Sequence, residues 1–311
     1  MKLIQNIYEF TEKLPNAVVT IGNFDGVHKG HQALLAEVKQ KAAALSGTSV
    51  AVTFEPHPIH VLQNNTYLPH ITLFDQKMEL LSQTGIDVTV CIPFTKEFAK
   101  LTAKQFVEDI LVRRIGMKAI VVGKDYAFGK NREGNVAFLQ ACGEQLGFEV
   151  IIKDWERYGG NKAERISSTQ IRETVMEGDV EKARDFLGRY YQIRGTVEKG
   201  RDRGGKLLGF PTANIRLQGE LCPKSGVYAV TVECAGGLYK GVANIGYSPT
   251  FTDHLFTIEV HIMDFNDNIY NQTIYVNFVK RLRDEKKFSD IAQLSVQINQ
   301  DILAARHLLN E

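Results

Sequence analysis

The stretch AVVTIGNFDGVHKGH, residues 17–31, combines the patterns of a buried strand, a turn and a helix start. Its first part, Ala17–Ile21, is an apolar run rich in β-branched residues, which is typical of a strand covered on both faces of a sheet. The glycines of GNFDG favour a turn in which the backbone comes close to a ligand. We therefore predict that a strand ends in this turn and that His28 begins the following helix.

The two histidines of this stretch, His28 and His31, share one face of the first helical turn because they are three positions apart. A helix N-terminus presents free N–H groups and the positive end of the helix dipole, which together favour a phosphate. Imidazole N–H groups there can donate hydrogen bonds to phosphate oxygens. By spacing alone, two solvated histidines or a zinc site are the alternatives, although no third zinc ligand is recognisable nearby.

Short apolar runs alternate with helical patterns through the first half of the chain. This alternation predicts a parallel, doubly wound sheet with helices on both faces, in which ligands bind at the carboxyl ends of the strands. The predicted strands are Ala17–Gly22, Ser49–Phe54, Asp87–Ile92, Lys118–Gly123 and Phe148–Lys153. The predicted helices are His31–Leu45, Asp75–Ser82 and Thr102–Ile115, of which the last begins with Thr102 and Gln105 in capping-box spacing.

The pattern changes near residue 187, beyond a short helical segment that ends at Gly188. From there β-branched and aromatic runs are separated by turn residues, which predicts an antiparallel barrel or sandwich. A final helix is predicted after Asp290, and its apolar stripe consists of Ile291, Leu294, Ile298, Ile302, Ala305 and Leu309. We therefore expect two unlike domains, 1–186 and 187–311.

The composition is that of an ordinary globular protein with local rather than global charge features. A net charge of +1 gives no indication of nucleic acid or a membrane as a partner. The four cysteines lie far apart and form no CxxC pair, so we expect buried free thiols. The N-terminus is too polar for a signal peptide, and no apolar run approaches the ~18 residues of a membrane span. We expect a cytoplasmic protein, whose oligomeric state the sequence does not specify.

The string GNFDGVHKGH at the end of a strand resembles the signature of the nucleotidyltransferase superfamily that uses an HxGH motif. Members transfer an adenylyl or cytidylyl group from a nucleoside triphosphate to a phosphate. A second string, ISSTQIR at 166–172, resembles the superfamily element that holds the outgoing β and γ phosphates. By this resemblance Ser168, Thr169 and Arg172 bind the pyrophosphate part of ATP. A plain helix cap is the alternative for this segment alone.

Two further stretches, TFEPHP (53–58) and VVGKDYAFGKNREGN (121–135), resemble segments of the bacterial bifunctional riboflavin kinase/FMN adenylyltransferase family. The resemblance implies a Rossmann-like N-terminal domain in which His28 and His31 are catalytic. It also implies contacts with the flavin from Asp125, Tyr126, Phe128 and Arg132. Core packing is the alternative for Tyr126 and Phe128. The ATP contacts implied for the turn are Gly22, Asn23, Phe24, Asp25 and Gly26.

The second half carries motifs that resemble those of riboflavin kinase, a small antiparallel β-barrel. They are GFPTAN (209–214), PKSGVYAV (223–230), GVANIGYSPTF (241–251) and IEVHIMDF (258–265). The resemblance implies that Thr212 and Asn214 hold Mg²⁺ with ATP, and that Glu259 is the general base for the ribityl 5′-hydroxyl. On its pattern alone, Glu259 is better explained as an outward-facing residue of a strand. His261 has no catalytic role in this interpretation.

The loop before GFPTAN departs from the family pattern. It is RGGKLLG here, whereas many relatives have a shorter RGRxxG. The kinase contacts with ATP implied by the resemblance are Gly205, Lys206, Gly209, Pro211, Thr212 and Asn214.

Taken with these motifs, the sequence predicts an enzyme that makes FMN from riboflavin and ATP, and then FAD from FMN and ATP. Two alternatives are an adenylyltransferase for another phosphorylated metabolite with an appended barrel, and a non-catalytic regulator that binds flavin or nucleotide.

Overall fold

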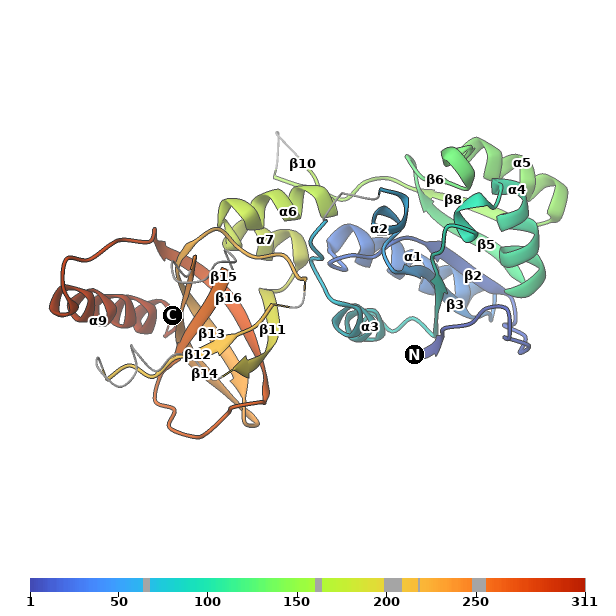
Figure 1. The fold of residues 1–311 in the computed structure, drawn as a ribbon. Helices are drawn as coiled ribbons and strands as arrows, with labels where there is room; N and C mark the ends of the chain where they lie inside the picture. Colours follow the sequence, from blue (N-terminus) through green and yellow to red (C-terminus); the bar gives the residue numbers. More distant parts are fainter. Residues whose placement is uncertain (64–67, 160–163, 199–208, 218, 248–255, 311) are drawn as a thin grey trace. The chain divides into compact units, whose positions relative to one another are not determined.

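The computed structural model describes the chain apart from residues 64–67, 160–163, 199–208, 218, 248–255 and 311 (Figure 1). Contacts divide the chain into two compact units, Met1–Ser168 and Thr169–Glu311. The first unit contains an α/β sheet and the second contains a closed barrel.

The first unit is built on a six-stranded sheet in the order β1-β4-β3-β2-β5-β8. Its strands are β1 (Lys2–Ile4), β2 (Ala17–Ile21), β3 (Ser49–Glu55), β4 (Val88–Pro93), β5 (Met117–Gly123) and β8 (Glu149–Lys153). All neighbouring pairs are parallel, as predicted. The strand order reverses between β2 and β5, so the turn that follows β2 lies where parallel sheets bind ligands.

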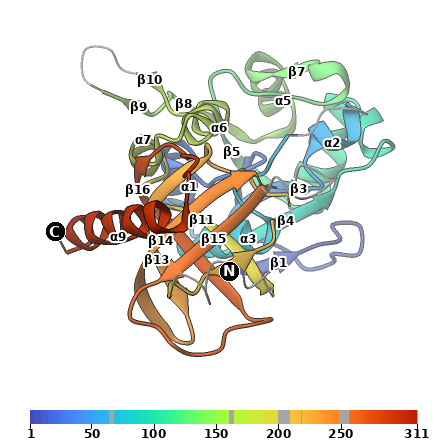
Figure 2. The same cartoon turned by 60° about the vertical axis from the view of Figure 1, so that its left-hand side comes forward.

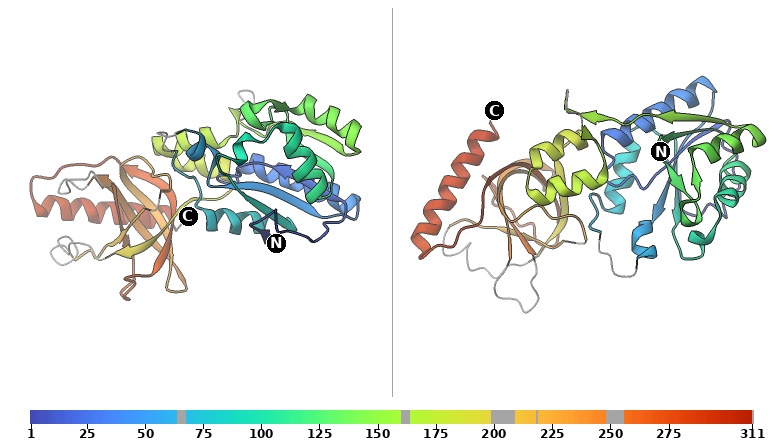
Figure 3. Two further views of the ribbon diagram at one scale, coloured as in Figure 1. Left: turned by 45° about the vertical axis from the view of Figure 1, so that its right-hand side comes forward. Right: turned by 90° about the horizontal axis from the view of Figure 1, so that it is seen from above.

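Helices cover both faces of this sheet (Figures 1 and 3). They are α1 (Lys29–Ala44), α2 (Pro58–Leu62), α3 (Phe74–Gln83), α4 (Ala103–Gln105), η2 (Phe106–Arg114) and α5 (Val136–Leu146), with single 3₁₀ turns η1 (Phe98–Lys100) and η3 (Lys130–Arg132). Val18 of β2 packs with α1 and α3 in one core cluster, whereas Val19 packs with η2 and α5 in the other. The doubly wound arrangement is therefore confirmed.

The structure differs from the sequence prediction in four places. β1 precedes β2, so the predicted first strand is the second. The predicted helix at Thr102–Ile115 has its capping box, but it continues as the π-helix η2. The helices α2 and α5 are absent from the prediction. The remaining small elements are two hairpins, β6 (Ala127–Phe128) with β7 (Gly134–Asn135), and β9 (Arg157–Tyr158) with β10 (Glu164–Arg165).

The second unit begins with α6 (Ser168–Glu177, whose first residue belongs to the first unit) and α7 (Val180–Leu187), which precede the barrel. The barrel strands are β11 (Tyr191–Glu198), β12 (Ala213–Ile215), β13 (Gly226–Cys234), β14 (Gly237–Tyr247), β15 (Phe256–Ile262) and β16 (Thr273–Arg283). They close in the order β11-β12-β15-β14-β13-β16, and β16 pairs with β11. Of the two architectures predicted for this half, the barrel is the one formed.

The C-terminal helix α9 (Ile291–Leu308) packs against the outside of the barrel (Figure 2). Asp290 caps it by accepting from the N–H of Gln293 at 2.9 Å, as predicted. Ala305 belongs to the cluster beneath the helix, and Ile302 and Leu309 pack against that cluster. The predicted apolar stripe is wrong at its first residue. Ile291 is the first residue of the helix, and its side chain is 58% exposed.

The four cysteines are free, as predicted. Cys91, Cys142 and Cys234 are buried and Cys222 is half-buried. Burial raises the pKa of Cys91 to about 11 and that of Cys222 to about 12, so these thiols stay protonated at neutral pH. Among the residues described, no helix combines the length and apolar character needed to cross a membrane.

Candidate active sites

The turn after β2 has an unusual backbone. Phe24 (φ 49°), Gly26 (φ 84°) and Val27 (φ 38°) all adopt left-handed conformations, which only glycine adopts without strain. The two strained side chains are buried, each 1% exposed, so surrounding packing holds them. A Cβ at Gly26 would lie 3.0 Å from Cγ2 of Ile71, which explains why this position is a glycine. Strain of this kind costs about 1–3 kcal/mol per residue and concentrates at functional sites.

Asp25 links this turn by hydrogen bonds to the segment before α3. Its carboxylate accepts hydrogen bonds from the N–H of Ile71 at 3.2 Å and from the N–H of Thr72 at 3.0 Å. Thr72 also accepts from the N–H of Gly26 at 3.0 Å. Asp25 is only 3% exposed. Its carboxylate therefore holds the turn in place.

His28 is the N-cap of α1. Its Nδ1 accepts the N–H of His31 at 3.3 Å, so the neutral ring carries its proton on Nε2. His28 is 5% exposed. A Cβ at Gly30 would lie 3.1 Å from Cε1 and Nδ1 of His28, so the glycine leaves room for the ring. The helix start thus fixes the ring orientation of His28.

The ring of His31 stacks on that of His28, with centroids 3.6 Å apart and an interplanar angle of 18°. Phe24 meets His31 edge-on at 5.2 Å. Burial, and secondarily the neighbouring His28, hold the pKa of His31 well below its ordinary value, so this ring is neutral at pH 7. Its buried Nδ1 has no hydrogen-bond partner within the described chain. A buried polar atom without a partner is costly, and here a ligand would satisfy it.

The start of α6 is joined to the same turn. Oγ of Ser168 donates to the backbone oxygen of Asp25 at 2.9 Å, so the predicted ATP-binding strings meet at this residue. Thr169 is exposed and Arg172 is 8% exposed; both lie on the first turns of α6. The structure thus brings Ser168, the first residue of α6, to the HxGH turn.

Asp125 lies just beyond β5, at the same edge of the sheet. Oδ2 of Asp125 is 2.6 Å from Arg165, and Oδ1 accepts from Nε1 of Trp155 at 3.1 Å. Partial burial alone would raise the pKa of Asp125, but the bonds from Trp155 and Arg165 outweigh it and lower the pKa. Lys124 and Arg165 lie over the indole ring at 4.0 and 4.4 Å. Sequence reasoning missed Trp155 and Arg165; the one tryptophan of the chain was the available signal.

The other predicted flavin residues lie beyond Asp125. Tyr126 and Phe128 stack at 5.4 Å with an interplanar angle of 17°. Phe128 is 9% exposed and belongs to the core, while Tyr126 is half-buried against it. Burial raises the pKa of Tyr126, so its hydroxyl stays protonated. Arg132 is exposed and has a left-handed backbone (φ 60°). Phe128 is therefore a core residue, whereas the side chains of Tyr126 and Arg132 remain partly accessible to solvent.

Three histidines that sequence reasoning missed gather beyond the carboxyl end of β3, the neighbour of β2. The rings of His60 and His70 are 5.0 Å apart, and that of His57 lies 6.0 Å from His60. Nε2 of His60 is buried and has no partner among the described residues. Burial lowers the pKa of His70, against the opposing effect of Asp25. Within the described ranges, no group of His, Cys, Asp and Glu is arranged to hold a metal ion.

In the barrel, Glu259 stands in a row of polar residues. The strand registers pair Glu259 of β15 with Asn214 of β12 on one side and Asn244 of β14 on the other. Ile258 and Val260, its neighbours in sequence, are 0% exposed and face the barrel interior. Glu259 is half-buried, and this burial raises its pKa. A carboxylate with a raised pKa between two amides is suited to accept a proton.

Thr212 instead lines a cavity of about 400 Å³ at β12 and β15. The cavity is lined by Val197, Pro211, Thr212, Ala213, Val260, Ile262, Phe265, Asn266, Asp267, Asn268, Ile269 and Tyr270. Glu259 is on the other face of β15 from Val260 and Ile262. The structure therefore places Asn214 beside Glu259 and Thr212 in the cavity. The segment 265–270 is the part of this cavity that sequence reasoning missed.

His261 contacts the segment at Pro211. Nδ1 of His261 lies 2.9 Å from the backbone oxygen of Pro211, and its ring meets Phe210 edge-on at 5.7 Å. His261 thus contacts the backbone at the start of the PTAN segment. Gly209 has a left-handed backbone (φ 75°). Gly205 and Lys206 lie outside the described residues.

Known proteins resemble this chain over both units. Residues 10–170 match the family model described as FAD synthetase, and residues 187–309 match that described as riboflavin kinase. A bifunctional riboflavin kinase/FMN adenylyltransferase of Haemophilus influenzae is 38% identical over 311 residues, which is all of both chains. The protein of the same name from Escherichia coli K12 is 36% identical over 308 residues, covering 98% of this chain and 97% of the relative.

A solved structure also resembles this chain. It is a crystal structure from Streptococcus pneumoniae of a protein named a macrolide-efflux protein, with a TM-score of 0.88 and 32% identity. The alignment covers 98% of each chain, so both units are included.

Proposed function

Because this chain belongs to the family of bifunctional riboflavin kinase/FMN adenylyltransferases, we propose that its two reactions take place at the HxGH turn and at Glu259 of the barrel. The enzyme phosphorylates riboflavin to FMN with ATP, and it adenylylates FMN to FAD with release of pyrophosphate. The observation that carries the assignment of the first site is the stacked pair His28–His31, with an unsatisfied nitrogen, at a helix start beside a switch point of the sheet.

In adenylyl transfer an FMN phosphate oxygen attacks the α-phosphorus of ATP, and the bond from that phosphorus to the bridging oxygen breaks. The attacking oxygen is already anionic, so the step needs no general base. Nε2–H of His28 donates to the α-phosphate, and His31, neutral at pH 7, donates from a nitrogen as charge builds up. The backbone of the Gly22–Gly26 turn holds ATP. Both electrostatic contributions are present before the reaction, because α1 and the strained turn fix the rings.

The leaving pyrophosphate is held by Ser168, Thr169 and Arg172 in this proposal. A hydroxyl pair and a guanidinium at a helix N-terminus are suitable partners for a polyphosphate. Ser168 supports this role because its hydrogen bond to Asp25 joins α6 to the turn. Asp125, Tyr126, Phe128 and Arg132 are proposed to contact the flavin, where Phe128 contributes mainly through the packing of Tyr126.

In the kinase reaction Glu259 takes the proton of the riboflavin 5′-hydroxyl while the oxygen bonds to the γ-phosphorus of ATP and ADP leaves. A hydroxyl is a weak nucleophile, and a carboxylate with a raised pKa is a better base than an ordinary one. Asn214 and Asn244, the cross-strand neighbours of Glu259, orient it. The proposed ATP contacts are Gly205, Lys206, Gly209, Pro211, Thr212 and Asn214.

Mg²⁺ is the metal we propose for the kinase reaction. The proposed donors are the hydroxyl of Thr212, which lines the cavity, and the amide of Asn214, two residues further on beside Glu259; both are neutral oxygen ligands of the kind that Mg²⁺ accepts together with phosphate and water. Thr212 also faces a cavity lined with the oxygen-bearing side chains Asn266, Asp267 and Asn268. When bound, the ion would neutralise negative charge on the ATP phosphates.

We further propose that the functional division is between residues 1–186 and 187–311. A cytoplasmic location is proposed because both reactions consume ATP and all four cysteines are free.

Two alanine variants test the assignment of sites. His28→Ala is expected to abolish FAD formation, by at least a hundredfold, and to leave FMN formation from riboflavin near wild type. Glu259→Ala is expected to block FMN formation and to leave added FMN convertible to FAD. Both products are measured by HPLC after incubation with ATP and Mg²⁺. Loss of both activities in either folded variant would contradict the proposal of two independent sites.

A further inference from the structure

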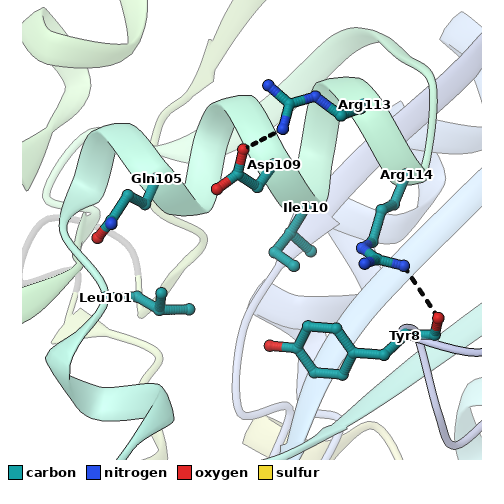
Figure 4. Close-up of a pocket in the computed structure, with 7 residues that line it drawn as sticks. All are labelled: Tyr8, Leu101, Gln105, Asp109, Ile110, Arg113 and Arg114. Atoms are coloured by element: carbon teal, nitrogen blue, oxygen red, sulfur yellow. Dashed lines mark hydrogen bonds and ion pairs between the residues drawn. The ribbon is translucent and has the colours of Figure 1, made fainter.

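A pocket of about 450 Å³ lies on the first unit, and none of the residues assigned to either reaction lines it (Figure 4). Its walls come from two distant parts of the chain, the segment at Tyr8 and the stretch from Leu101 along η2 to Arg114. This volume is in the range of small-molecule sites. The proposed function uses none of its residues, and Gln105 is the one lining residue that belongs to a sequence motif, the capping box.

The floor of this pocket is aromatic and aliphatic. Figure 4 shows the ring of Tyr8 beneath Ile110, with its hydroxyl toward Leu101. Tyr8 is 51% exposed, whereas Ile110 is 2% exposed. An open tyrosine ring beside aliphatic side chains offers a flat surface for another ring, which gains from stacking and from burial of apolar area.

The charges around the pocket leave one cation without a counter-charge. Asp109 and Arg113 form an ion pair at 2.6 Å, so they neutralise each other. Nη1 of Arg114 donates to the backbone oxygen of Tyr8 at 3.0 Å, and the guanidinium lies 5.1 Å from the centre of the Tyr8 ring. In the part of the chain that the structure describes, Arg114 has no acidic partner. A guanidinium has five N–H donors, so Arg114 can still bind an anion.

The wall at Leu101 is preformed. Its backbone oxygen accepts from the N–H of Lys130 at 2.9 Å, and the N–H of Ala103 donates to Glu133 at 2.8 Å. The capping box of Thr102 and Gln105 fixes the residues between. A ligand therefore finds this wall in place and bears little ordering cost.

The opposite wall is the π-helix η2. Its last turn has the bond from the N–H of Ile115 to the oxygen of Ile110, a five-residue step at 3.0 Å. Asp109, Ile110, Arg113 and Arg114 of η2 line the pocket, and Gln105 at the end of α4 precedes them. π-helical segments are rare and occur frequently at functional sites, so η2 is a second indication of a site here.

We propose that this pocket binds a small organic anion with a flat ring, in which the ring lies on Tyr8 and a carboxylate or phosphate pairs with Arg114. The shared chemistry is an anionic group attached to an aromatic ring. Such binding is independent of the two reactions, because no assigned catalytic residue lines the pocket.

The test is a titration of the full chain with phenyl phosphate and with 4-hydroxybenzoate, followed by calorimetry and ligand-observed NMR. Inorganic phosphate lacks the ring and benzyl alcohol lacks the charge, so both are expected to bind at least tenfold more weakly than the two probes. Arg114→Gln and Tyr8→Ala are expected to weaken the probes at least tenfold. The matched control removes the ion pair as a unit: the double variant Asp109→Asn/Arg113→Gln leaves the net charge of the pocket unchanged, and it is expected to change affinity less than threefold.

The same experiment tests whether the probes bind at either site of the proposed function. The probes are expected to bind His28→Ala and Glu259→Ala as they bind the wild type. Equal binding by wild type and Arg114→Gln would overturn the proposal, as would loss of probe binding in His28→Ala or Glu259→Ala, which would place the probes at a site of the proposed function. Tyr8 and Arg114 are exposed, so unchanged thermal melting of their variants is expected and distinguishes lost binding from lost fold.

Discussion

At the scale of single residues, Gly30 controls the geometry of His28. Gly30→Ala adds a Cβ 3.1 Å from the His28 ring, which must shift to make room. A displacement of this kind costs on the order of a hundredfold in rate when it moves a catalytic group. We expect FAD formation to fall 10- to 100-fold while FMN formation is unchanged, as measured by steady-state kinetics of each reaction.

The control for Gly30→Ala is the reverse change on the same helix. Ala36 is exposed on α1, so Ala36→Gly lowers the free energy of unfolding by about 1 kcal/mol without approaching His28. If Ala36→Gly reduced FAD formation as much as Gly30→Ala does, helix stability rather than ring placement would be the cause.

Glu259 predicts a pH dependence for the kinase reaction. Burial raises its pKa in the folded enzyme above the ordinary ~4.3 of glutamate. A general base works when deprotonated, so kinase activity is expected to fall as the pH falls through this raised pKa. FAD formation from FMN, measured on the same preparation, should not show this loss of activity at low pH. A kinase profile that stays flat down to the ordinary glutamate pKa would argue against Glu259 as the base.

The same shift has a consequence for stability. An acid with a raised folded pKa binds its proton more tightly when folded, so its stabilising contribution is present below the unfolded pKa and is lost as the pH rises through the folded pKa. Glu259→Gln removes that loss, and it should leave the free energy of unfolding at pH 7 equal to or above that of wild type even though kinase activity disappears.

The residues of the adenylyl site were predictable in part. The spacing of His28 and His31 predicted a shared helix face, and the structure stacks their rings. The use of the Asp25 carboxylate was not predictable, because its partners Ile71 and Thr72 are 46 and 47 positions away and a sequence motif does not contain them. The same holds for Trp155 beside Asp125, a contact across 30 positions.

At the scale of elements, long apolar strands were predicted well and small elements were not. The five strands predicted for the sheet correspond to β2, β3, β4, β5 and β8 within a few residues, because continuous apolar runs define them. β1 has three residues and α2 has five, too short for a periodic pattern. The π-winding of η2 keeps an apolar stripe, so the sequence indicated only a helix there.

α9 offers the clearest energetic prediction at this scale. Arg283 of β16 donates from Nε and Nη2 to Asp301 at 2.9 and 2.7 Å, and the side chain of Asp301 is 7% exposed. Asp301→Asn leaves the guanidinium of Arg283 largely buried without its charge partner. We expect the free energy of unfolding of the barrel to fall by on the order of 3 kcal/mol in urea denaturation.

The matched control lies on the same helix. Arg306 pairs with Asp264 at 2.7 Å, but the two side chains are 43% and 71% exposed. Water screens such a pair, so Arg306→Gln should cost less than about 1 kcal/mol. Equal losses for the two variants would mean that burial does not determine the strength of these contacts.

At the scale of the whole molecule, two unlike architectures were predicted from the change of pattern near residue 187, and they are the two observed. Whether the second half formed a barrel or a sandwich depended on the pairing of β16 with β11, which joins residues far apart in sequence. The sequence pattern of a strand indicates which of its residues are apolar. Whether the sheet closes into a barrel depends on the pairing of its first strand with its last, which no single strand pattern contains.

Separate sites predict complementation between variants. An equimolar mixture of His28→Ala and Glu259→Ala is expected to convert riboflavin to FAD, because each variant retains the reaction that the other lacks and FMN can diffuse between them. A lag in FAD appearance should accompany an early accumulation of FMN. If the mixture made FMN but no FAD, FMN released into solution would not be a substrate for the other chain.

The position of Trp155 gives the enzyme an optical probe of its own. It is the single tryptophan of the chain, its indole N–H is bound to Asp125, and two cations lie over its ring. Indole emission is sensitive to such neighbours, and isoalloxazine rings absorb light where indole emits. Binding of a flavin nucleotide near Asp125 should therefore quench the intrinsic tryptophan fluorescence of the unlabelled protein. Binding at this site can then be followed in real time, because the barrel contains no tryptophan and contributes no indole emission.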